Sequence, residues 1–147
     1  MTFAFLLVLT AQAGGTVELE KRMLELINVE RDARGIPPLE LHPELSDMAR
    51  EYSAKMASSG RVDHERDRPM DERIRKVLPN TCMFAENVSK NTSVDYALSD
   101  LMTSEGHRDN LLNPRYIAVG IGIVRSEDDY LYITQEFSRS CEPGRRR

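Results

Sequence analysis

The sequence predicts an α+β domain in which helices cover a small antiparallel sheet. Apolar residues recur at helical spacing in several segments of the first part of the chain, for example Leu45, Ala49 and Met56. From residue 116 to 124 the period changes to the alternation of a strand, and a second β-prone stretch follows after a turn. At 147 residues, the chain has the length of one domain with a sizeable core.

The N-terminus, residues 1–13, is interpreted as a signal peptide. An uncharged apolar run closes on the small-x-small triplet Ala11, Gln12 and Ala13, the form of a cleavage site. Cleavage would leave residues 14–147 as a single domain with a short basic tail from about residue 142. The run is too short to anchor the protein by crossing a bilayer. We expect no transmembrane segment in the chain that remains after its removal. The alternative is a buried first strand or helix of the domain.

Two longer helices are expected next. Thr16 can cap the first, which ends at Gly35 and presents an apolar face of Leu19, Met23, Leu26 and Ile27. A short extended stretch, 39–41, leads to the second helix. This helix begins with Pro43, a residue suited to the first helical turn, and ends at Gly60.

Two further helices precede the sheet. A short helix is expected over residues 70–78, where Pro79 terminates it. Ser93 can start another helix, which we expect to stop at Gly106.

The last elements are expected to form an antiparallel hairpin. Residues 116–124 place Ile117, Val119, Ile121 and Ile123 on one face and Ala118, Gly120 and Gly122 on the other. The glycine face leaves room for the close approach of a neighbouring element. Residues 126–129 form the turn, and 130–138 return as the partner strand.

Composition narrows the classes of partner and compartment. Charged residues make up 30% of the chain and the formal net charge is -4, so we expect no nucleic-acid partner. The chain has two cysteines, Cys82 and Cys141, and an even number in a short exported protein favours a disulfide bond. Two free buried thiols are the alternative.

Three side chains are candidates for chemistry: His64, Glu86 and His107. Both histidines stand in charged or glycine-punctuated segments, and Glu86 is embedded in an apolar run, where a carboxylate must be paired or functional. The third histidine, His42, precedes a helix start and is interpreted as structural. Taken singly, each candidate is also explained by a hydrogen-bonded structural role.

Together these residues lie in motifs that resemble the bacterial SCP-like branch of the CAP superfamily (cysteine-rich secretory proteins, antigen 5 and pathogenesis-related 1 proteins). The motifs are Ala-Glu-Asn-Val at 85–88, Gly-His-Arg-Asp-Asn-Leu-Leu-Asn-Pro at 106–114 and Ile-Thr-Gln-Glu-Phe at 133–137. The resemblance implies an αβα sandwich with a polar cleft to which His64, Glu86 and His107 belong. Ala85 replaces the family's usual glycine, and Glu136 is not assigned to the cleft.

The leading functional hypothesis is an exported, monomeric binding or interaction module, found in the periplasm or outside the cell. Its partner would be an unknown small molecule, a lipid, or a cell-wall or host component. No cofactor is required, but His64, His107 and Glu86 are candidate ligands for a divalent metal such as zinc. The alternative is a metal-dependent hydrolase such as a peptidase, although the sequence identifies no catalytic residue. A third interpretation is that the three side chains only hold loops together.

Overall fold

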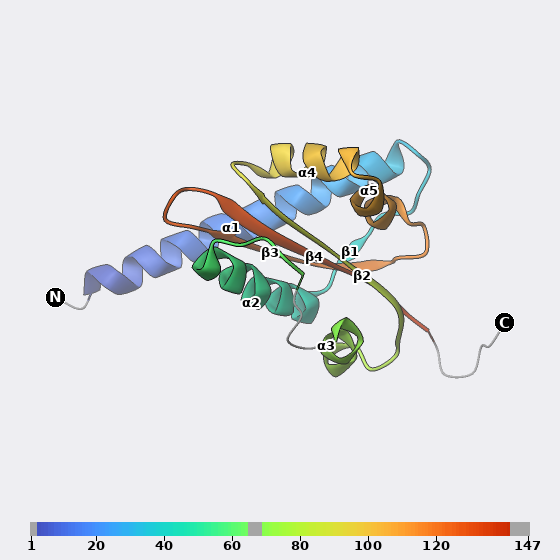
Figure 1. Cartoon of the computed structure of the whole chain (residues 1–147), viewed down its shortest axis with the longest axis horizontal. Helices are drawn as coiled ribbons and strands as arrows, with labels where there is room; N and C mark the ends of the chain where they lie inside the picture. The colour runs from blue at the N-terminus through green and yellow to red at the C-terminus, as the bar shows by residue number, and fades with distance from the viewer. Residues whose placement is uncertain (1–2, 65–68, 142–147) are drawn as a thin grey trace.

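The computed structural model describes residues 3–64 and 69–141, with side chains from residue 15 onward. Helices lie on both faces of a four-stranded sheet, which confirms the α+β class and the αβα sandwich (Figure 1). The elements are α1 (Phe3–Asp32), β1 (Glu40–Leu41), α2 (Pro43–Ser59), α3 (Met70–Val77), β2 (Thr81–Asn91), α4 (Val94–Thr103), α5 (Glu105–Leu112), β3 (Ala118–Arg125) and β4 (Leu131–Ser140).

The sheet has the strand order β1-β3-β4-β2. The predicted hairpin of β3 and β4 is present, and β2 pairs antiparallel with the other side of β4. The short strand β1 runs parallel to β3, so the sheet is mixed rather than wholly antiparallel. The physical reason is connectivity, because a long crossover through α2, β2 and α4 separates β1 from β3, whereas antiparallel neighbours can be joined by a tight turn.

Helix α1 begins earlier than the sequence predicted. It runs without interruption from Phe3, so Thr16, the predicted cap, lies inside the helix. Two adjacent glycines at this point lower helix propensity without breaking a helix whose later turns are held by packing. The predicted cleavage site at Ala11–Ala13 lies outside the described side chains, and the tail from 142 lies outside the described residues. No helix in the described part of the chain is long and apolar enough to span a membrane.

Helix α2 packs directly on the glycine face of β3. A Cβ atom at Gly120 would lie 2.3 Å from the backbone carbon of Leu45, and one at Gly122 would lie 2.1 Å from the backbone nitrogen of Arg50. Such distances exclude any side chain, so the prediction of a close approach at these glycines is confirmed. The helix ends at Gly60, whose φ of 68° is the left-handed cap that glycine favours.

Two further elements, β2 and α4, differ from the sequence prediction. Strand β2 was not predicted, because polar residues such as Glu86 and Asn87 interrupt the apolar alternation that indicates a strand. The fourth predicted helix ends at Thr103 rather than at Gly106, and Ser104 in an extended conformation separates it from α5. Both differences concern the segments that carry Glu86 and His107.

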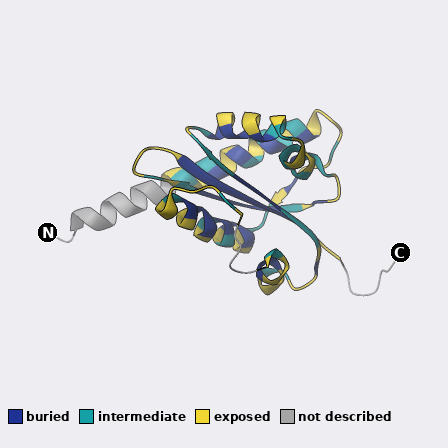
Figure 2. Cartoon of the chain, viewed as in Figure 1, coloured by how far each residue is buried: buried dark blue, intermediate teal, exposed yellow. Residues whose placement is uncertain are grey.

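Among the described residues, buried positions follow the strands and the inner sides of the helices, and exposed positions lie mainly on the outer surface (Figure 2). The main apolar core lies between the sheet and the layer of α1, α4 and α5 and includes Met23, Ile27, Leu101, Ile121 and Phe137. Cys82 and Cys141 form a disulfide with a Cα–Cα distance of 5.7 Å. This confirms the predicted bridge, which ties the chain after β4 to the beginning of β2.

Candidate functional site

The candidate site is built around Glu86 in the edge strand β2. Its neighbour in the sheet register is Glu136 of β4, and both carboxylate side chains are fully buried. Two buried acids opposite each other require compensation, because ionised carboxylates are costly to remove from water. The neighbours of Glu86 therefore decide what the site can do.

The first neighbour is His64, which follows α2 and stays half exposed. Its Nδ1 lies 2.8 Å from Glu86 Oε1, and its side chain is 52% exposed while that of Glu86 is 0% exposed. An ionised carboxylate only accepts hydrogen bonds, so Nδ1 is the donor in this pair. The other ring nitrogen, Nε2, takes no part in this contact.

The second neighbour is Arg73 of α3, whose side chain is 1% exposed. Its guanidinium bridges the two acids: Nη2 lies 3.1 Å from Glu86 Oε2, and Nη1 lies 3.2 Å from Glu136 Oε1. The same guanidinium lies 5.9 Å from the centre of the Tyr52 ring. Both oxygens of Glu86 are thus engaged, one by Arg73 and one by His64.

Glu136 has an unusual electrostatic environment. Burial raises the pKa of this carboxyl well above its ordinary value, and the adjacent Glu86 carboxylate raises it further, while Arg73 acts in the opposite direction. A raised pKa favours the protonated acid.

His107 comes to the site from α5, on the other side of the edge strand. Burial lowers its pKa and the charge of His64 lowers it further, so the imidazole is neutral at neutral pH. Asn87, next to Glu86 in β2, donates from Nδ2 to the His107 carbonyl oxygen at 3.1 Å. Asn87 is itself held by Gln135 at 3.1 Å and by Asn110 at 2.9 Å. An amide network therefore fixes the backbone that presents His107.

Of the predicted site residues, the structure brings His64 and Glu86 into direct contact and places His107 within electrostatic range of His64. His42 lies elsewhere, with Nδ1 3.2 Å from Glu44 at the start of α2. Arg73 was not among the predicted site residues, and Glu136, which was not assigned to the cleft, contacts the same Arg73 guanidinium as Glu86. A signal for Glu136 was present, since a charged residue inside a predicted buried strand requires a partner.

The donor atoms of His64, Glu86 and His107 decide whether these side chains could hold a metal ion. Each oxygen of Glu86 already accepts a hydrogen bond, from Arg73 and from His64, and its side chain is 0% exposed, which favours a position behind a ligating histidine over direct ligation. Within residues 3–64 and 69–141, no group of three or more His, Cys, Asp and Glu side chains is arranged to hold an ion. The imidazoles of His64 and His107 fit as nitrogen donors, with Glu86 in the supporting position that carboxylates commonly take behind a ligating histidine.

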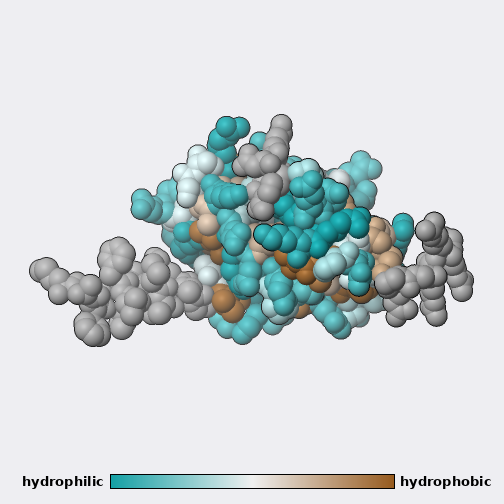
Figure 3. Space-filling model, turned by 90° about the horizontal axis from the view of Figure 1, so that it is seen from below, coloured by the Kyte–Doolittle hydropathy of each residue, from teal (hydrophilic) through white to brown (hydrophobic). Residues whose placement is uncertain are grey.

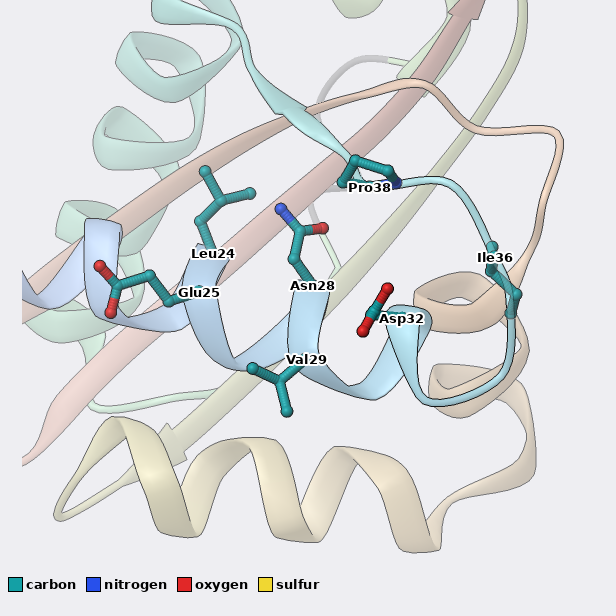
Figure 4. A pocket seen from close by; sticks show the side chains of 7 residues that line it. All are labelled: Leu24, Glu25, Asn28, Val29, Asp32, Ile36 and Pro38. Carbon is teal, nitrogen blue, oxygen red and sulfur yellow. The ribbon is translucent and has the colours of Figure 1, made fainter.

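The surface on the side of α2 and α3 is mainly hydrophilic, and its apolar patches are small and separated by polar side chains (Figure 3). A different hollow of about 480 Å³ lies along α1, away from the histidine site (Figure 4). None of its lining residues belongs to the cluster just described, and Asn28 in its wall is engaged by the backbone of Leu39. This hollow is not part of the candidate site.

Known proteins are similar to this chain in sequence and in fold. The model of the cysteine-rich secretory protein (CAP) family matches residues 24–137. The YkwD protein of Bacillus subtilis strain 168 is 33% identical over 132 residues, covering 87% of this chain and 50% of that protein. This chain thus spans about half the length of YkwD.

Two solved structures are similar in fold. An outer surface protein from Borrelia burgdorferi has a TM-score of 0.79 at 19% identity, over 86% of this chain and 96% of that one. An extracellular protein containing an SCP domain, from Bacillus anthracis strain Ames, has a TM-score of 0.74 at 24% identity, over 85% of this chain and 41% of that one. Since the family model spans α1 to β4 and includes every residue of the candidate site, the chain belongs to the cysteine-rich secretory protein (CAP) family.

Proposed function

We propose that the chain is an exported binding module in which the imidazoles of His64 and His107 offer ring nitrogens to a polar ligand or a divalent cation such as zinc. The observation that carries the proposal is the His64–Glu86 contact at 2.8 Å. A buried carboxylate on Nδ1 fixes the tautomer and orientation of a half-exposed ring and makes Nε2 a better electron-pair donor.

Export is supported by three observations. The Cys82–Cys141 bridge is of the kind that persists in oxidising compartments. Two proteins of the same fold are described as an outer surface protein and an extracellular protein. The uncharged apolar run at residues 1–13 supplies the expected targeting signal.

The hydrolase alternative is not part of the proposal. A metal-dependent hydrolase would activate water on a bound ion rather than a side-chain nucleophile, and no observation on the described residues favours turnover over binding. Both cysteines are used in the disulfide.

The test is calorimetric titration of the oxidised, folded protein with zinc at about pH 7.5, because protons compete with the metal for imidazole nitrogens at lower pH. We expect His64→Ala and His107→Ala each to weaken zinc binding by about tenfold or more. His42→Ala is the matched control, because it removes the remaining histidine outside the cluster and should bind as the wild type does. Wild-type affinity in both His64→Ala and His107→Ala would refute the proposed site.

A further inference from the structure

We infer that Arg73, anchored by Glu136, is a positioning residue of the site, which fixes Glu86 so that this carboxylate orients His64. The inference deepens the proposed function and rests on it for the use of the site. The geometry of the positioning can be measured without any ligand.

The fixing of Glu86 follows from the shape of the guanidinium. Its two arms contact Glu86 at 3.1 Å and Glu136 at 3.2 Å. A planar fork with several donors can hold two carboxylates at a fixed separation, whereas a lysine ammonium is a single point on a flexible stem. Because Glu86 Oε2 is held by Arg73, the other oxygen, Oε1, is directed to His64 Nδ1.

Glu136 supplies the fixed point for this arrangement. It lies in β4, a strand with a neighbour on each side, and faces Glu86 in the β2–β4 register. Arg73 donates hydrogen bonds to both Glu136 and Glu86, and Glu86 contacts His64. The effect of Glu136 on His64 therefore passes through Arg73 and Glu86. The position of Glu136 in β4 therefore determines where the guanidinium of Arg73 lies.

Arg73 is also linked to the segment of His64 through Tyr52. The guanidinium lies 5.9 Å from the Tyr52 ring centre, a distance typical of cation–π contacts. The Tyr52 hydroxyl donates to the carbonyl oxygen of Asp63, the residue that precedes His64. Arg73 thus supports both the side chain of His64, through Glu86, and the backbone before it, through Tyr52.

The experiment uses Arg73→Lys, with Arg75→Lys as the matched control on the exposed side of the same helix. Nitrogen NMR of the ligand-free protein reports which nitrogen of the His64 ring carries the proton. In the wild type and Arg75→Lys we expect the proton on Nδ1. In Arg73→Lys we expect the signals of exchanging tautomers, and a loss of about tenfold in zinc affinity, the size typical of a lost supporting contact behind a ligand.

A second pair of variants keeps the test decisive if Arg73→Lys does not fold. Glu136→Gln retains an acceptor oxygen for Arg73 and should leave the His64 signals and the zinc affinity within about twofold of the wild type. Glu136→Leu removes the acceptor and should reproduce the effect of Arg73→Lys.

Unchanged His64 signals in both Arg73→Lys and Glu136→Leu would overturn the inference. A wild-type protein that shows the Nδ1 proton, loses it in these variants and yet binds no zinc would refute the proposed function and support the positioning role. The two failures are therefore distinguishable.

Discussion

Arg31 and Arg73 are both fully buried arginines, but their partners belong to different chemical classes. Arg31, at the end of α1, donates only to backbone carbonyls: those of Pro37 and Leu111 at 2.8 Å, Asn113 at 3.1 Å and Tyr116 at 3.2 Å. Arg73 instead bridges two carboxylates. Burial lowers the pKa of Arg31, which has no carboxylate among these partners to offset the loss of water.

The comparison separates a structural role from a functional one. Carbonyl oxygens do not titrate, so Arg31 joins the end of α1 to the end of α5 in the same way at any ordinary pH. Arg73 belongs to a group of titratable side chains that ends in a half-exposed histidine. Complete burial of an arginine therefore says nothing about its role until its partners are known.

The largest expected effect is the loss of stability on Arg31→Met. The substitution leaves several buried carbonyl oxygens without a donor where α1, α5 and the loop before β3 meet. We expect the free energy of unfolding to fall by about 3–5 kcal/mol, measured by urea denaturation. Arg34→Met, which removes an exposed arginine from the same region, should cost no more than about 0.5 kcal/mol. Equal effects of the two substitutions would contradict the structural role of Arg31.

A smaller effect is expected in the coupling between Arg73 and Glu136. Arg73→Met leaves two buried carboxyl groups without their cation, and removing one of them should relieve part of the cost. In a double-mutant cycle with Glu136→Leu, we expect a coupling free energy of about 1–3 kcal/mol, measured from the unfolding of the four proteins. Additive effects would show that the bridge between Arg73 and Glu136 does not contribute.

The smallest effect is a dependence of stability on pH that the partners of Arg73 should produce and the partners of Arg31 should not. The pKa of Glu136 is raised in the folded state, so the folded protein binds the proton more tightly than the unfolded chain does. Stability should then decrease as pH rises above the ordinary glutamate value of about 4.3, and stop decreasing above the folded pKa. Glu136→Gln, which cannot ionise, should lose this decrease.

The measurement is the free energy of unfolding of the wild type and Glu136→Gln at successive pH values. The difference between the two should grow with pH in favour of the variant, by at most about 1.4 kcal/mol per pH unit. Arg31→Met should run parallel to the wild type over the same range, because its lost partners do not titrate. A constant difference between wild type and Glu136→Gln would show that folding does not raise the pKa of this carboxyl.

Several features could be determined from the sequence alone because they depend on neighbours along the chain. Apolar spacing, Pro43 and Gly60 predicted α2, and the glycines of β3 predicted room for a close neighbour, although not that α2 is this neighbour. The motif around Glu86 indicated a polar site. The even number of cysteines indicated a disulfide, which the structure confirms.

Only the tertiary structure decided which side chains meet at the site. Strand β2 has too little apolar alternation to be recognised alone and is defined by its long pairing with β4, which places Glu86 opposite Glu136. Arg73 is one of several arginines in a charged segment, and it becomes part of the site only because α3 packs against β2. The physical reason is that a buried charge such as that of Arg73 is stable only beside groups that compensate it. Those groups, Glu86 and Glu136, lie on strands that are distant from Arg73 or from each other in the sequence.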